Sequence, residues 1–496
     1  MTHERDTISR NAGFAFAIKI VGAVCSGALL LVLVRVLGPE EFGVFALAMS
    51  IGGLVFLPAD LGIAQSAARY AAESISDRRA VAAVVSDALR VKLLATGVVS
   101  LALAAAAGPI AEGYGEPDLV WPLRILALSL FAESFLLLYN ALFQALGRIS
   151  TYLRVVALES TAEASLSIAI VLLGGGAAGA MAGRAAAYAF AAGYGLVVVA
   201  RTIGGTVSIK RGAGGGHLGR IFGYGSALLI VDGAVTLFNR LDAILIGAIV
   251  SVTAVGLFEP AILFAGFLGY VGQALSAAVA PRMARSETEE PDLPLLERTL
   301  GIVILLQGVF VAPLLVWAEP IQALVLGPGY EESADVLRAL APFAFLVGVS
   351  PMVSLSVNYL GGAGRRIPIA VGAVLINVAI DVVLLPEIGI VAAAIGTVVA
   401  YSFYVAAHLW LLRRMVGLSL RPVALGLVYA TAAAAGMAAV LYALGTEDVA
   451  LPRLILGAPL GVATYVVALV LLRAVTVADL RGAVARMRTM VRPRVS

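Results

Sequence analysis

Long apolar runs separated by short polar segments extend along nearly the whole chain. Many of these runs reach 18 residues or more, which is the length that an α-helix needs to cross the hydrocarbon core of a bilayer. We therefore predict an all-α integral membrane protein with about fourteen transmembrane helices. The predicted spans are residues 12–36, 43–66, 87–108, 119–142, 153–173, 178–200, 222–249, 254–281, 299–317, 337–360, 367–385, 389–411, 422–444 and 454–473.

Three polar segments show how these helices are joined. LGPEEFG at 37–43 and LPEIGIVAAA at 385–394 combine Gly and Pro between apolar runs, and such residues are typical of tight turns. LGPGYEESADVLR at 326–338 is longer and carries more charge, so it predicts a longer, charged loop between two further apolar runs.

Composition agrees with a membrane protein. Apolar residues make up 61% of the chain, charged residues only 13%, and the mean hydropathy is +1.00, whereas soluble domains carry about 25% charged residues. The sequence pI of about 9.0 does not indicate nucleic-acid binding, because the basic residues are spread over short loops. Cys25 is the single cysteine, which excludes an intrachain disulfide and a Cys-based metal site.

The distribution of positive charge predicts the orientation. With the N-terminus inside, most of the 34 Lys and Arg residues fall in cytoplasmic segments, and such asymmetry in short loops favours that topology. This count places Lys92 with a cytoplasmic segment and Arg184 at an outer helix end. Both termini are therefore predicted in the cytoplasm of a multi-pass protein of the cell membrane, and the first apolar run is expected to be retained rather than cleaved.

An internal repeat predicts the domain organisation. GVFALA at 43–48 resembles GLFEPA at 256–261, and Arg69 and Arg282 have corresponding positions after them. A repeat of six spans returns the chain to its starting side, so the two six-helix lobes are parallel and related by pseudo-twofold symmetry. The predicted parts are a first lobe at 1–210, a second lobe at 211–415, two extra helices at 416–475 and a basic cytoplasmic tail at 476–496.

Enzyme motifs are missing from the sequence. The three lysines, Lys19, Lys92 and Lys210, do not follow glycine, so no P-loop is present. The three histidines form no HExxH zinc motif. We therefore expect neither an enzyme nor a bound cofactor or metal centre.

Several segments resemble one family of transporters. VRVLGPEEFG at 34–43, DLGIAQSAARYAAE at 60–73, RLDAILIGAIVSVTAVGLFEPA at 240–261 and INVAIDVVLLPEIGIVAAAIGTVVA at 376–400 are similar to polysaccharide and oligosaccharide flippases. These flippases are the polysaccharide-transporter branch of the multidrug/oligosaccharidyl-lipid/polysaccharide exporter superfamily. The resemblance implies movement of isoprenoid-linked oligosaccharide or polysaccharide repeat units between membrane leaflets. It also implies contact with membrane lipids and with glycan-assembly proteins, and no nucleic-acid partner.

Ionisable residues inside membrane spans are costly, and are therefore candidates for function. The predicted cavity residues are Lys19, Asp60, Asp232, Asn239, Arg240 and Asp242. In one interpretation Lys19 and Arg240 bind the pyrophosphate of the lipid carrier, as a point charge and a bidentate fork. In the other, Lys19 with Asp232 and Arg240 with Asp242 or a neighbour are structural ion pairs.

A second group of polar residues has two interpretations as well. Its members are Glu133, Glu159, Glu163, Asn377 and Asp381. They either bind a coupling cation, H⁺ or Na⁺, or form structural pairs. Glu259 beside Pro260 is predicted to act at the start of its helix rather than on substrate.

Two other transport functions remain open at this stage. A multidrug or cation antiporter of the same superfamily commonly has an acidic residue in the first span, whereas this chain has Lys19 there and no acid between Asp6 and Glu40. A peptidoglycan-precursor (lipid II) flippase is the second alternative, because that family also has a cationic cavity.

Overall fold

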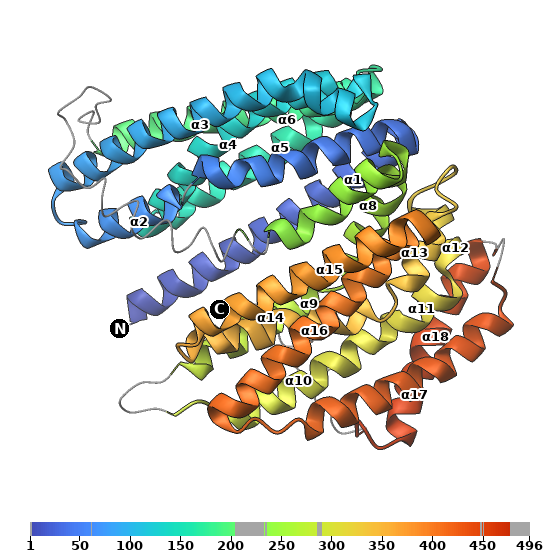
Figure 1. Cartoon of the computed structure of the whole chain (residues 1–496). Coiled ribbons are helices and arrows are strands. Elements are labelled where there is room, and N and C mark those ends of the chain that lie inside the picture. The colour runs from blue at the N-terminus through green and yellow to red at the C-terminus, as the bar shows by residue number, and fades with distance from the viewer. Residues whose placement is uncertain are drawn as a thin grey trace. The chain divides into compact units, whose positions relative to one another are not determined.

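The structure is a computed structural model of the whole chain, in which every regular element of the described residues is a helix (Figure 1). It describes residues 2–60, 62–203, 233, 236–284, 290–446, 449 and 451–476, and the side chains in these ranges other than those of 2–20, 202 and 203. Residues 236–249 are helical. The other elements are α1 (Thr2–Asp60), α2 (Ile63–Glu73), α3 (Arg78–Tyr114), η1 (Pro117–Leu119), α4 (Val120–Ala145), α5 (Ile149–Leu172), α6 (Gly176–Ile203), α8 (Val252–Phe267), α9 (Tyr270–Val279), η2 (Ala280–Met283), α10 (Leu293–Gln307), η3 (Gly308–Phe310), α11 (Val311–Val316), α12 (Ala318–Val325), α13 (Ser333–Ala339), α14 (Phe343–Tyr359), η4 (Ala363–Arg366), α15 (Ile367–Ile388), α16 (Val391–Val416), α17 (Arg421–Ala443) and α18 (Leu451–Leu471).

The predicted all-α membrane class is confirmed. Within the described residues, ten helices are long and apolar enough to cross a membrane, and up to twelve when each of two bent pairs counts as one span. The bent pairs are Val252–Phe267 with Tyr270–Met283, at 42°, and Ser333–Ala339 with Phe343–Tyr359, at 55°. The predicted number of fourteen is not confirmed, and the predicted span 222–249 lies only partly within the described residues.

The first predicted turn is a break inside α1. Gly38 has φ 71° and ψ 176°, a conformation that glycine adopts without steric cost. The two arms of α1 therefore form a hairpin (Figure 1). Just after the break, a carboxylate oxygen of Glu41 accepts a hydrogen bond of 2.6 Å from the backbone N–H of Ala177, at the start of α6. Glu41 thus caps α6, where an acidic group also interacts favourably with the helix dipole.

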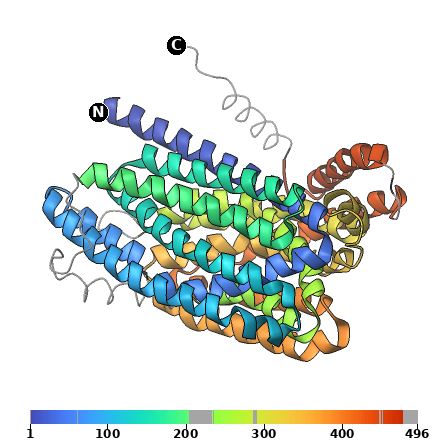
Figure 2. The same ribbon diagram turned by 90° about the horizontal axis from the view of Figure 1, so that it is seen from above.

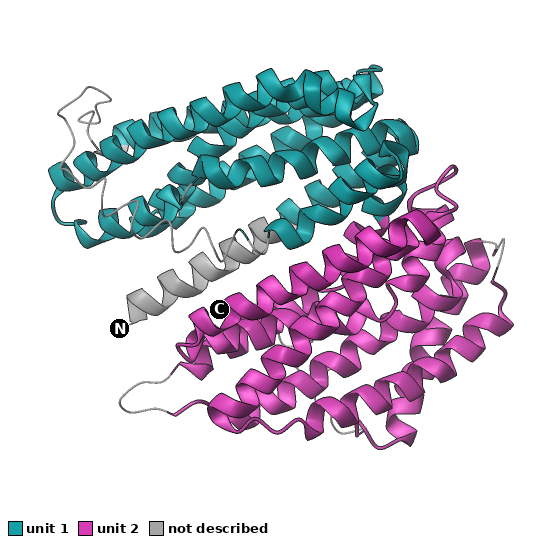
Figure 3. Ribbon diagram, viewed as in Figure 1, with its two compact units in different colours: residues 1–260 teal, residues 261–496 magenta. Residues whose placement is uncertain are grey.

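The chain divides into two compact units (Figure 3). Unit 1 is residues 1–260 and unit 2 is residues 261–496. The predicted boundary between six-helix lobes, at residues 210 and 211, lies outside the described residues, so that division stays a prediction.

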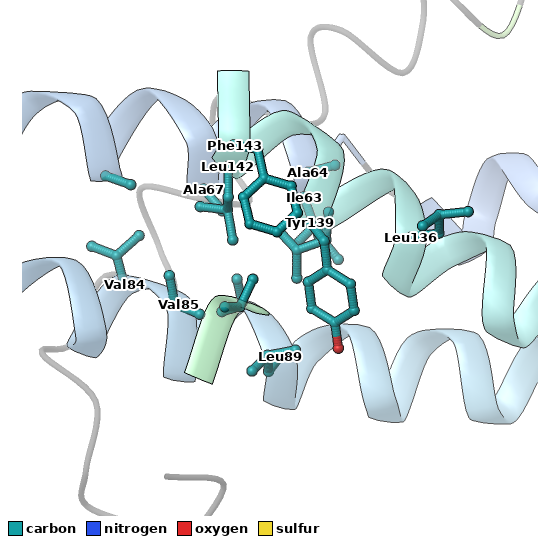
Figure 4. Packing of buried hydrophobic residues seen from close by; sticks show 14 of the residues in the cluster. Ile63, Ala64, Ala67, Val84, Val85, Leu89, Leu136, Tyr139, Leu142 and Phe143 are labelled. Carbon is teal, nitrogen blue, oxygen red and sulfur yellow. The ribbon is translucent and has the colours of Figure 1, made fainter. Parts of the chain in front are cut away.

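The core of unit 1 is an apolar cluster shared by α2, α3, α4 and α6 (Figure 4). Aromatic rings of α4 pack against short side chains of α2 and β-branched side chains of α3. The labelled members are Ile63, Ala64, Ala67, Val84, Val85, Leu89, Leu136, Tyr139, Leu142 and Phe143. This packing joins α3, α4 and α6, which carry Lys92, Glu133 and Arg184.

Helices α5 and α6 lie side by side (Figure 2), and glycines of α6 face α5. Gly179 and Gly183 are four residues apart, so they lie on one face of α6. A methyl group at Gly183 would lie 2.4 Å from the Cα of Ser167 on α5. Small residues permit such contacts in membranes, where dispersion rather than the hydrophobic effect holds helices together.

A second glycine contact lies between α1 and α8 within unit 1. A methyl group at Gly256 would lie 1.8 Å from the carbonyl oxygen of Pro39, and one at Gly43 would lie 2.1 Å from that of Val252. Both obstacles are backbone atoms, so side-chain rearrangement cannot relieve them.

Unit 2 has its own apolar core, formed mainly by α10, α14, α16 and α17. The last helix, α18, packs against α17, and the hydroxyl of Tyr465 donates a 2.7 Å hydrogen bond to the carbonyl of Leu305 on α10. The indole N–H of Trp317 donates a 3.0 Å hydrogen bond to the carbonyl of Gly445. The predicted extra C-terminal helices are thus attached to unit 2 by polar as well as apolar contacts.

Candidate functional site

Arg240 lies within the helix at 236–249 and is half-buried. Its side chain covers Gly53 of α1, where a methyl group would lie 3.0 Å from Arg240 Nε and 3.4 Å from Cδ. The absence of a side chain at Gly53 therefore makes room for the arginine.

Two carboxyl groups share the surroundings of Arg240. Glu259 on α8 is 7% exposed and Asp242 is 8% exposed. The guanidinium of Arg240 attracts a negative charge on Glu259, and the carboxylate of Asp242 repels it. Sequence reasoning assigned Glu259 to the helix start, but its burial beside these charges makes it a further candidate residue. Asn239, by contrast, is exposed on the same helix.

The proposed partnership between Lys19 and Asp232 lies outside the described residues. The backbone of Lys19 is part of α1, but its side chain is not described, and Asp232 lies in 204–232. Their pairing and their role in binding stay predictions.

Asp60 forms a buried ion pair with Lys92 of α3. The Lys92 side chain is 0% exposed and that of Asp60 is 14% exposed. The Lys92 ammonium also donates a 2.8 Å hydrogen bond to Ser134 Oγ of α4, which lies 2.9 Å from Thr96 Oγ1. The side chain of Lys92 is therefore inside the protein, where Asp60 compensates its charge, and its place on the cytoplasmic side stays a prediction.

A second ionic cluster connects α4, α5 and α6. Arg184 binds Glu163 through Nη1 and lies 3.1 Å from Glu133 Oε2 through Nη2. Its guanidinium carbon lies 4.2 Å from the centre of the Tyr188 ring, and Glu159 lies one helical turn before Glu163 on α5. We refer to these five residues as the Arg184 cluster.

Arg184 is largely buried within this cluster, and its place near an outer helix end stays a prediction. Its side chain is only 12% exposed and is bound to carboxylates of two other helices. Sequence reasoning named all three glutamates but missed their partner, because an arginine near the predicted start of a span resembles a flanking residue. The i, i+4 spacing of Glu159 and Glu163 was a signal that a cation faces them.

The last predicted pair lies between α15 and α16 in unit 2. Asn377 is 1% exposed and Asp381 is 0% exposed. A methyl group at Gly396 would lie 2.6 Å from Asp381 Oδ1 and 3.0 Å from Asn377 Nδ2. Glycine thus leaves space for both polar groups, and among the described residues neither polar atom of the Asn377 amide has a hydrogen-bond partner. No three His, Cys, Asp or Glu side chains converge to hold a metal ion within the described ranges.

Comparison with known proteins places this arrangement in context. A family model described as polysaccharide biosynthesis protein matches residues 32–335. The probable low-salt glycan biosynthesis flippase Agl15 of Haloferax volcanii is 23% identical over 421 residues, which are 83% of this chain and 84% of that protein.

Solved structures show the same fold. The lipid II flippase MurJ, in an inward closed conformation, has a TM-score of 0.77 at 12% identity and covers 93% of this chain and 98% of its own. An inward-facing MATE family multidrug resistance transporter of the MOP superfamily has a TM-score of 0.61 at 18% identity. The match covers 80% of this chain and 95% of the transporter.

A multi-pass helical protein with this fold and with ionic clusters inside its spans is a flippase or transporter of the multidrug/oligosaccharidyl-lipid/polysaccharide exporter superfamily, and not an enzyme. The chain belongs to the polysaccharide biosynthesis protein family, whose model matches more than half of it, and thus to the polysaccharide flippase branch of that superfamily.

Proposed function

We propose that this protein moves isoprenoid-lipid-linked oligosaccharide or polysaccharide repeat units across the cytoplasmic membrane by alternating access. The observation that supports the proposal is Arg240, a half-buried guanidinium within the predicted span 222–249 of a polysaccharide-family protein. The resemblance to a probable glycan biosynthesis flippase supports the substrate class. Rocking of the lobes at 1–210 and 211–415 would expose the substrate to each side in turn.

The chemistry of Arg240 fits the diphosphate of a lipid carrier. A guanidinium offers a planar fork of donors that matches two phosphate oxygens, and it remains charged in a membrane. Asp242 and Glu259 balance this charge when no substrate is bound. Lys19 is proposed as a second contact, acting as a point charge.

The test is flipping in sealed proteoliposomes that contain an isoprenoid-diphosphate oligosaccharide, measured by the access of a membrane-impermeant glycosidase. Arg240→Gln is expected to reduce flipping by roughly tenfold or more, because charge-assisted hydrogen bonds contribute about 1.5–3 kcal/mol each. The flipping rate of Arg240→Lys should lie between those of wild type and Arg240→Gln, since lysine keeps the charge but loses the forked geometry of the guanidinium. The matched control is Arg201→Gln, at an exposed position on α6, which should flip normally.

A purely structural Arg240 would behave differently. Its loss would lower the melting temperature, and the paired change Arg240→Gln with Glu259→Gln would restore both stability and flipping. That rescue would contradict the binding role.

We also propose that both termini lie in the cytoplasm. With Cys25 replaced by alanine, single cysteines can be introduced at the exposed positions Ser76 and Glu331. A membrane-impermeant maleimide added to intact cells should label Glu331→Cys and leave Ser76→Cys unlabelled. The reverse pattern would invert the topology.

A coupling cation, H⁺ or Na⁺, and contact with glycan-assembly proteins complete the proposal. Asn377 and Asp381 stay predicted as a coupling or structural pair. Their burial and the space that Gly396 leaves around them support either role.

A further inference from the structure

The bend between α8 and α9 has no proline near its centre. The two helices meet at 42°, and residues 261–280 contain no proline. Gly269, which precedes α9, has φ −72° and ψ −13°, in the right-handed helical region. The backbone at the bend is therefore close to that of a continuous helix, and small changes in its dihedral angles would straighten it.

Two other breaks in the described helices are fixed by the residues that form them. At the break inside α1, Gly38 has a φ of 71° and is followed by Pro39. At the break before α14, Pro342 is the residue that precedes the helix, and a proline disfavours helical angles at the residue before it. The bend between α8 and α9 lacks such a cause within its own sequence, so contacts from other helices must hold it.

The contact that holds this bend comes from α10. The N–H groups of Leu268 and Gly269 donate to carbonyls three residues before them, at 3.2 and 3.0 Å, rather than four residues before as in an α-helix. In a continuous helix the carbonyl of Leu268 would accept from the N–H of Gly272. Here it accepts a 3.0 Å hydrogen bond from the side-chain amide of Gln307, the last residue of α10. A side chain inserted into the hydrogen-bond ladder is a recognised cause of helix kinks.

Gln307 lies where α9, α10 and α14 meet, and it is 0% exposed. A methyl group at Gly348 of α14 would lie 2.3 Å from Gln307 Nε2, and one at Gly272 of α9 would lie 2.2 Å from the carbonyl oxygen of Gly348. The two glycines thus make room for the amide and let α9 and α14 approach. Tyr465 of α18 binds the carbonyl of Leu305, two residues before Gln307, so α18 also holds this end of α10.

Packing is looser on the α8 side of the bend. Within the described residues, no atom lies within 4 Å of a methyl group placed at Gly266, and Leu263 is 43% exposed. On the α9 side, Gly272 is in close contact with α14, and Val279 belongs to the apolar core of unit 2. The end of α8 can therefore swing while α9 stays in place.

We propose that the segment Leu268–Gly269 is a hinge and that the amide of Gln307 is the clasp that holds it bent. When the clasp opens, the carbonyl of Leu268 can accept from the N–H of Gly272, and α8 comes into line with α9. One hydrogen bond replaces another, so this buried carbonyl is satisfied in both states. The swing would also move Glu259, which lies on α8, and only the use of this movement in flipping rests on the proposed function.

The distance between two spin labels in the full-length protein tests the hinge. With Cys25 replaced by alanine, labels at Leu263→Cys on α8 and Leu375→Cys on α15 occupy exposed positions within unit 2. Leu263 precedes Leu268 by five residues, which is about 7.5 Å of helix. Straightening of the 42° bend would therefore move this label by about 5 Å. Gln307→Met has a side chain of similar length that cannot donate, and it should add a second distance population.

Two further variants complete the test. Gly348→Ala displaces the same amide without changing Gln307 and should produce the same second population, which guards against a Gln307→Met variant that fails to fold. The matched control, Gln273→Leu, alters an exposed glutamine of α9 and should keep the wild-type distance.

A purely structural Gln307 would give another result. Folded Gln307→Met or Gly348→Ala protein with a lower melting temperature and an unchanged distance distribution would overturn the hinge. The measurement needs no substrate, so its outcome is independent of the proposed function.

Discussion

Lys92→Met is expected to destabilise the protein strongly. The Lys92 side chain is wholly buried and compensates Asp60. Removing one partner of a buried ion pair costs about 3–5 kcal/mol, because the remaining charge is stranded. Thermal unfolding of the purified protein in detergent should therefore shift to a clearly lower temperature.

The double variant Lys92→Met with Asp60→Asn isolates the cause. It should recover most of the lost stability, because it removes the stranded carboxylate. The control is Arg69→Met, which breaks an exposed pair with Glu73 whose side chains are 52% and 45% exposed. Exposed pairs contribute about 0–1 kcal/mol, so this change should be small. Equal effects at Lys92 and Arg69 would contradict a buried pair.

The second large effect is expected at Gly256. Even a methyl group there would overlap the backbone oxygen of Pro39, and overpacking of this kind costs about 1–3 kcal/mol or more. Gly256→Ala should lower the melting temperature because α1 and α8 must separate. Gly266 lies on the same helix with no atom within 4 Å of an added methyl group. Gly266→Ala should be neutral or slightly stabilising, because alanine favours a helix more than glycine does.

A melting temperature of Gly256→Ala equal to that of wild type would show that the two helices separate without cost. An equally large decrease in the melting temperature of Gly266→Ala would indicate that the flexibility of glycine matters rather than close packing. Either result would contradict the interpretation of this contact.

The class of fold was predictable because the apolar runs are long and the turns contain Gly and Pro. The break at Gly38 falls in the predicted turn for that reason. Two bent pairs, in α8 with α9 and in α13 with α14, were less visible, since a bend between two apolar helices interrupts hydropathy very little.

The candidate site was predictable only one residue at a time. A carboxyl or amide side chain within an apolar run stands out in the sequence, so Glu133, Glu159, Glu163, Asn377 and Asp381 could be named. Their partners could not, because pairing depends on how distant helices pack. Lys92 lies 32 residues from Asp60 and binds it. The residues around the partner in such a contact contain no sequence pattern that identifies it.

Glycines posed the same difficulty. Gly53, Gly256 and Gly396 look alike in sequence, yet one makes room for Arg240, one meets the backbone of α1 and one faces Asn377 and Asp381. Only the neighbouring helix distinguishes these roles, and the neighbour is a property of tertiary packing.

The contact between Glu41 and the start of α6 also bears on where charge can sit across the bilayer. Alanine and glycine dominate the first half of α6, so few of its side chains would hold it at one level against the lipid. Arg184 follows Gly176 by eight residues, which is about 12 Å of helix. By fixing the first turn of α6, the carboxylate of Glu41 sets the depth at which the guanidinium meets its acidic partners. A sliding motion of α6 along its axis would have to break that cap first.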